Sequence, residues 1–113
     1  MSISTHVLDT SLGKPAEGVS VTLIRVNEEG ASGIVATGVT NADGRIPALV
    51  PEGMDAERGH YRLVFDVAPY FLASGRTSFY PVIAVDFTVG NEPQHYHVPL
   101  LLNAFGYSTY RGS

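Results

Sequence analysis

Short apolar stretches, in which hydrophobic residues occupy every second position, run along most of this chain. Residues 19–24 follow the pattern with Val, Val and Leu at alternate positions, and residues 61–67 follow it with Tyr, Leu, Phe and Val. Further stretches of strand-like length and composition are residues 3–8, 34–39 and 82–89. Successive side chains of a β-strand point to opposite faces, so each stretch predicts a strand with one buried face.

Turn-forming residues separate these strands about every ten residues. Gly, Pro, Asn and Asp cluster at residues 13–15, 27–30, 41–44 and 90–93, and such clusters form tight turns. The helical signal is confined to residues 69–74, where Pro69 stands at an opening position and Gly75 follows the end. Residues 51–59 predict a long, mobile surface loop. Short strands between frequent turns predict an antiparallel β-sandwich or barrel with one short helix.

Residues 98–102 depart from the alternation because Val98, Pro99 and three leucines are apolar at consecutive positions. A strand of this composition is covered on both faces, whereas the outer face of a two-layer domain normally meets water. We interpret this segment as part of a symmetric contact with a second copy of the chain. A strand end tucked beneath a loop is the alternative.

Composition narrows the classes of protein that remain. The 113 residues fit one domain, 1–113, and a hydrophobic content of 44% is ordinary for a globular chain. The absence of Cys excludes disulfide scaffolds, thiolate zinc sites and cysteine nucleophiles. A net charge of −4, with Lys14 as the single lysine, argues against nucleic acid as a partner. No apolar run approaches the ~20 residues of a membrane-spanning helix, and the first ten residues do not resemble a signal peptide, so we expect a cytoplasmic protein.

Two histidines, His95 and His97, lie two residues apart in a predicted strand. Both imidazoles therefore point to one face, with Tyr96 on the other. Imidazole transfers protons near neutral pH, and it is also the commonest metal ligand. Together with His6, the pair suggests acid–base chemistry or a zinc or copper site, while surface or core histidines without a chemical role are the alternative.

Three other positions are candidates on weaker grounds. His6 lies in the first predicted strand and shares a face with Ser4 and Leu8, where a purely structural role is the alternative. We expect His60, at the end of a loop, to be solvated. Arg45 follows a tight turn, where it either extends into water or clamps an anion through its rigid fork of donors.

The end of the chain is unusual. Termini are commonly ragged and polar, but residues 105–113 carry three aromatic side chains, an arginine and three hydroxyls. The plain interpretation of this segment is an edge strand.

Four segments occur in order along the chain: Ser4-Thr5-His6-Val7-Leu8-Asp9 with Gly13-Lys14-Pro15-Ala16, Asn41-Ala42-Asp43-Gly44-Arg45, His95-Tyr96-His97-Val98-Pro99-Leu100-Leu101, and Tyr107-Ser108-Thr109-Tyr110-Arg111-Gly112-Ser113. Together they resemble the motifs of the 5-hydroxyisourate hydrolases, which are transthyretin-related enzymes of urate breakdown. The resemblance covers nearly the whole chain.

The resemblance implies an all-β, transthyretin-like fold, an antiparallel β-sandwich of two four-stranded sheets with one short helix. It also implies a homotetramer, built as a dimer of dimers, with active sites in a channel at the dimer–dimer interface. His6, Arg45 and His97 would be the catalytic residues. Substrate would be bound by His6, Arg45, His95, Ser108, Tyr110 and Ser113. Transthyretin itself, a hormone carrier, lacks the Tyr-Arg-Gly-Ser ending and the hydrolase histidine–arginine set, so the resemblance favours an enzyme.

The implied reaction belongs to urate (purine) catabolism and opens the six-membered ring of 5-hydroxyisourate, giving 2-oxo-4-hydroxy-4-carboxy-5-ureidoimidazoline. No metal and no cofactor is implied. A neutral histidine, His6 or His97, would take a proton from water. Arg45 would hold the substrate and stabilise the oxyanion that develops on the attacked carbonyl. Tyr110 and Ser113 would close the pocket.

Overall fold

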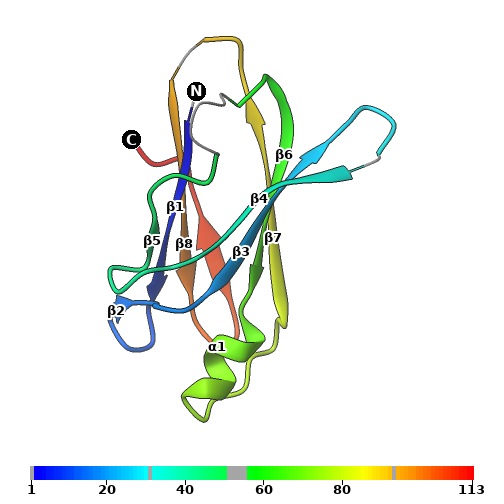
Figure 1. The fold of residues 1–113 in the computed structure, drawn as a ribbon. Helices are drawn as coiled ribbons and strands as arrows, with labels where there is room; N and C mark the ends of the chain where they lie inside the picture. Colours follow the sequence, from blue (N-terminus) through cyan, green and yellow to red (C-terminus); the bar gives the residue numbers. More distant parts are fainter. Residues whose placement is uncertain (1, 31, 51–55, 93) are drawn as a thin grey trace.

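The computed structural model describes residues 2–30, 32–50, 56–92 and 94–113. Within them, two β-sheets pack face to face, with a short helix at one end and both termini toward the other end (Figure 1). The elements in chain order are β1 (Ser2–Asp9), β2 (Lys14–Pro15), β3 (Ser20–Val26), β4 (Ser32–Val39), β5 (Arg45–Ile46), β6 (Gly59–Asp66), α1 (Ala68–Ala73), β7 (Val82–Val89), β8 (His95–Leu102) and β9 (Tyr107–Thr109). This arrangement confirms the predicted β-sandwich with one short helix.

The core lies between the two sheets and is built from the alternating apolar positions. On β6, Tyr61, Leu63 and Phe65 are buried, and on β3 Val21 and Leu23 are buried opposite them in the strand register. Burying a Val, Leu or Phe side chain completely stabilises a fold by about 1.5–3 kcal/mol. The alternation read from the sequence therefore identifies the inner face of the second sheet, whose strand order is β4-β3-β6-β7.

The first sheet, of order β2-β1-β8-β9, differs from the predicted all-antiparallel arrangement. β1 and β8 run parallel, with Ser4 beside His97 and His6 beside Pro99. Parallel neighbours need a long connection, and here the whole second sheet lies between them in the sequence. This sheet also has a fifth strand, because the two-residue β5 pairs with the free edge of β1 next to β2. Two residues are too few to produce an alternation that sequence analysis can detect.

The helix α1 agrees with the predicted helical segment to within one residue at each end. Pro69 stands in its first turn, where no backbone N–H is needed, and Gly75 follows with a φ of 73°, a conformation that favours glycine. Phe71 is fully buried and anchors the helix to the core. At six residues, this helix is well short of a membrane span, and no other helix occurs in the described ranges.

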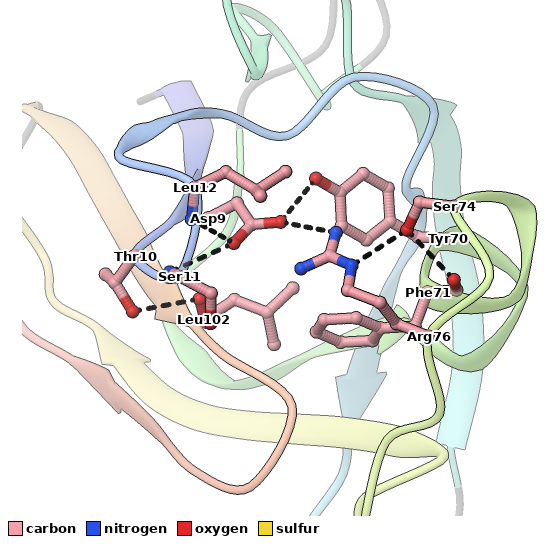
Figure 2. A network of polar contacts seen from close by, with 9 residues as sticks. All are labelled: Asp9, Thr10, Ser11, Leu12, Tyr70, Phe71, Ser74, Arg76 and Leu102. Atoms are coloured by element: carbon pink, nitrogen blue, oxygen red, sulfur yellow. Dashed lines mark hydrogen bonds and ion pairs between the residues drawn. The ribbon is translucent and has the colours of Figure 1, made fainter.

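A buried carboxylate at the end of β1 fixes α1 to the first sheet (Figure 2). Asp9, which has no exposed surface, accepts hydrogen bonds from Tyr70 Oη at 2.7 Å and Arg76 Nη2 at 2.8 Å, and from the N–H groups of Ser11 and Leu12. Burial disfavours ionisation of Asp9, but these hydrogen bonds outweigh that effect and lower its pKa. The network holds the strand that also carries the first histidine.

Residues 98–102 occupy most of β8, and their side chains alternate despite the continuous apolar run. Val98, Leu100 and Leu102 face the core, while Pro99 and Leu101 lie on the outer face of the first sheet. Pro99 is buried within the single chain and Leu101 is half-buried. Part of the outer face is thus covered by the chain itself, and a contact there with a second copy stays a prediction.

Two predicted connections fall partly outside the described residues. They are the loop over residues 51–59, of which residues 51–55 are not described, and the turn over residues 90–93, of which residue 93 is not described.

Candidate functional site

A cavity of about 510 Å³ opens on the outer face of the first sheet. It is lined by Ser4, Thr5, His6, Arg45, Pro47, His95, His97, Tyr110, Gly112 and Ser113. Six of the seven site residues predicted from the sequence are in this lining. The seventh, Ser108, is exposed on β9 and lies beside Leu101 in the strand register, outside the cavity lining.

The parallel pairing of β1 with β8 brings the three histidines of the cavity together. His95 and His97 share the outer face of β8, while Tyr96 between them is buried in the core, as the alternation predicts. The ring centroids of His6 and His97 lie 6.4 Å apart, and those of His95 and His97 lie 6.3 Å apart. The imidazole of His6, which is distant in sequence, therefore joins those of His95 and His97 in one cluster.

A rigid turn delivers Arg45 to this cluster. The side chain of Asn41 accepts hydrogen bonds from the N–H groups of Asp43 and Arg45 at 2.9 and 3.0 Å. Gly44 has a φ of 74°, and a side chain there would collide with the carbonyl oxygen of Val7. The turn then enters β5, where Arg45 lies directly opposite His6 on β1.

The end of the chain forms the remaining wall. β9 pairs antiparallel with β8, and Thr109 Oγ1 donates to the carbonyl oxygen of Pro99 at 2.6 Å. Beyond β9 the chain continues along the same edge, where the Gly112 N–H donates to the His97 carbonyl oxygen at 2.8 Å. This path puts Tyr110 and Ser113 in the cavity lining. The predicted edge strand is present as β9, and the contribution of the residues beyond it to a binding site stays a prediction.

Ser4 connects two of the histidines. Its Oγ lies 2.7 Å from Nε2 of His95 and 2.7 Å from Nδ1 of His97, and Ser2 Oγ contacts Nδ1 of His95. Ser4 is not among the site residues predicted from the sequence. Its position two residues before His6 on the same strand face was the available signal.

The electrostatic character of the cavity favours neutral imidazole and an oxygen-rich ligand. No Asp or Glu side chain is part of the described lining, whereas the Arg45 guanidinium is. Burial lowers the pKa of His97, and Arg45, His6 and His95 lower it further by disfavouring a second positive charge nearby. A neutral imidazole can accept a proton, and guanidinium donors bind planar oxygen groups.

A second, larger hollow of about 1010 Å³ lies near one end of the second sheet and includes His60. Nε2 of His60 lies 2.7 Å from Oδ2 of Asp86, and Arg62 binds the same carboxylate. His60 is exposed to solvent, as expected, and the cross-strand pairing of β6 with β7 also gives it a carboxylate partner. Among the described residues, no three His, Asp or Glu side chains are grouped so as to hold a metal ion.

Residues 3–112 match the HIUase/Transthyretin family. The chain belongs to that family. It is 50% identical to a 5-hydroxyisourate hydrolase of Halalkalibacterium halodurans over 117 residues, which cover 98% of this chain and 97% of the relative. The solved structure of Klebsiella pneumoniae 5-hydroxyisourate hydrolase superposes with a TM-score of 0.85 at 40% identity, covering 100% of both chains.

The family's fold alone does not separate the hydrolases from transthyretin. Sea bream transthyretin, solved in complex with thyroxine, superposes with a TM-score of 0.91 at 34% identity, covering 99% of this chain and 95% of that one. This transthyretin superposes at least as closely as the hydrolase does. The composition of the cavity, rather than the backbone, must therefore decide what the site does.

Proposed function

We propose that this chain hydrolyses 5-hydroxyisourate in urate catabolism. The observation that carries the proposal is the convergence of His6, His97 and Arg45, from three separate segments, on one cavity without an acidic side chain in its described lining. The names of the hydrolase relatives support the same substrate. A volume of about 510 Å³ suits a small planar heterocycle.

In the proposed mechanism, a neutral histidine, His6 or His97, takes a proton from water as the water oxygen attacks a ring carbonyl. Arg45 binds substrate oxygens and stabilises the negative charge that grows on the attacked carbonyl oxygen. The ring C–N bond then breaks, and the histidine returns its proton to the departing ring nitrogen. The product is 2-oxo-4-hydroxy-4-carboxy-5-ureidoimidazoline, and the residues act without a metal or cofactor. Tyr110 and Ser113 close the cavity over the ring.

We further propose that the working form is a homotetramer, a dimer of dimers, in which copies of this cavity face one another across the dimer–dimer interface. Leu101 and Leu8 lie half-buried on the outer face that carries the cavity, and Tyr110 at the cavity rim is exposed. A second copy covering this face would exclude water from the cavity. Light scattering after size exclusion, which measures the mass of the assembly, tests this assignment.

The decisive experiment follows the ultraviolet absorbance of freshly generated 5-hydroxyisourate with and without the protein. A hydrolase accelerates the loss of this absorbance in proportion to protein concentration. A small-ligand carrier that uses the same cavity binds its ligand and leaves the spontaneous rate unchanged. A metal-binding protein is distinguished by elemental analysis and by loss of function with a chelator, whereas the proposed reaction continues in its presence.

A further inference from the structure

We propose that Ser4 is a positioning residue that fixes the tautomer of His97, so that Nδ1 carries the proton and Nε2 is the proton acceptor in the cavity. This inference rests on the proposed function and assigns the general base to one atom of one histidine. It derives from the contacts of Ser4 Oγ with both Nε2 of His95 and Nδ1 of His97.

The hydroxyl of Ser4 couples the two rings because it has one hydrogen to donate. If it donates to one imidazole nitrogen, it can only accept from the other. In the neutral state, His95 Nε2 and His97 Nδ1 must therefore differ, one with a proton and one with a lone pair. Ser4 is 5% exposed and is paired beside His97 in the parallel register, so its hydroxyl stays between the two rings.

The charge in the cavity selects one of the two arrangements. Nδ1 of His97 faces Ser4, and among the described residues no protein group hydrogen bonds to Nε2, the nitrogen left for a ligand. Arg45, which has donors only, lines the same cavity. The positive potential of the guanidinium favours a lone pair on Nε2. It disfavours an N–H at that atom, because the N–H hydrogen carries a partial positive charge.

The remaining protons follow from this choice. His97 Nδ1–H donates to Ser4 Oγ, the Ser4 hydroxyl donates to His95 Nε2, and His95 Nδ1–H donates to Ser2 Oγ. Ser2 is exposed at the start of β1, so its own hydroxyl hydrogen can point to water. The series of hydrogen bonds from Ser2 to His97 then has one donor and one acceptor at every contact. In this arrangement His95 orients the hydroxyl of Ser4.

The test uses the full-length protein labelled with ¹⁵N at histidine, in long-range ¹H–¹⁵N correlation spectra at a pH where His97 is neutral. His97→Asn identifies its signals. In the wild-type protein we expect His97 to be protonated on Nδ1 and unprotonated on Nε2. Ser4→Ala should convert His97 to a mixture of both tautomers and lower kcat by about tenfold, the effect of one orienting hydrogen bond, with little change in KM. Ser20→Ala, an exposed serine at the start of β3 in the other sheet, should change neither.

Each contrary result overturns the assignment. A wild-type His97 protonated on Nε2 excludes it without any substitution. A Ser4→Ala protein that keeps the wild-type tautomer or the wild-type kcat also excludes it. The spectra are recorded without substrate, so they report on Ser4 even if the protein does not accelerate 5-hydroxyisourate loss, an outcome that overturns the proposed function instead.

Discussion

Gly112 packs directly against the imidazole of His97. Its N–H donates to the His97 carbonyl oxygen at 2.8 Å, and a Cβ at this position would lie 2.5 Å from Cδ2 of the ring. Real Cβ atoms do not come so close, so a larger residue must displace either the ring or the end of the chain. The position of the His97 ring therefore depends on a glycine near the end of the sequence.

Gly112→Ala should consequently disturb the site without disturbing the core. Displacing a catalytic ring by about 1 Å can lower a rate by about 10²-fold, and we expect a loss of kcat of that order. Turnover of 5-hydroxyisourate, measured by absorbance, checks this. Gly33→Ala is the matched control, because a Cβ at Gly33 on β4 meets no atom within 4 Å. Wild-type turnover in Gly112→Ala would mean that the ring is not held by this contact.

Substitution of the proposed catalytic residues should abolish turnover while the assembly persists. We expect Arg45→Ala and His97→Asn each to lower the rate by about 10²–10³-fold, toward the uncatalysed background. Both side chains line the outer cavity rather than the core, so the fold should persist. We expect the variants to elute as the same oligomer. Wild-type turnover in His97→Asn would contradict the proton-transfer role.

The lowered pKa of His97 sets the expected pH dependence. Only the neutral imidazole accepts a proton, so kcat/KM should fall on acidification with a midpoint below 6.5, the ordinary value for histidine. Burial is the main cause and the Arg45 charge the next. Arg45→Gln should therefore raise the His97 pKa part of the way, as measured by an NMR titration. An unchanged titration would exclude the electrostatic contribution of Arg45.

The longer strands could be predicted because each is a local pattern. Alternation located the buried faces of β3 and β6, and the Pro and Gly at its ends located α1. The parallel pairing of β1 with β8 could not be predicted in this way. It is set by packing between segments at opposite ends of the sequence, and no local pattern encodes that register.

The same limit applies to the site. Strand periodicity put His95 and His97 on one face of their strand and put His6 on the same face of its own strand as Ser4 and Leu8. It could not show that these two faces are continuous in the folded sheet. The bridging role of Ser4 and the contact of Gly112 with His97 both depend on that register. Arg45 was a candidate only through its turn and the resemblance, because β5 is two residues long.

The structural role of Asp9 was also not predicted from the sequence. Its surroundings lead to a prediction about the free energy of unfolding. Asp9→Ala removes a fully buried carboxylate and leaves Arg76 and Tyr70 without their acceptor. Breaking a buried ion pair in this way costs about 3–5 kcal/mol. Asp86→Ala is the matched comparison, because Asp86 also pairs with an arginine but is 39% exposed, and such pairs contribute at most about 1 kcal/mol. Urea denaturation at one protein concentration measures both free energies of unfolding.

The pH dependence of the unfolding free energy lost in Asp9→Ala identifies the origin of that loss. The pKa of Asp9 is lowered in the folded protein, so its stabilisation is complete above the unfolded value of about 3.9 and is lost as the pH falls through the folded value. The alanine variant has no carboxylate to protonate, so the gap in unfolding free energy between wild type and Asp9→Ala should narrow below about pH 4. A gap that persists at lower pH would show that Asp9 acts through packing rather than through its charge. Equal losses in Asp9→Ala and Asp86→Ala would show that burial does not set the strength of these pairs.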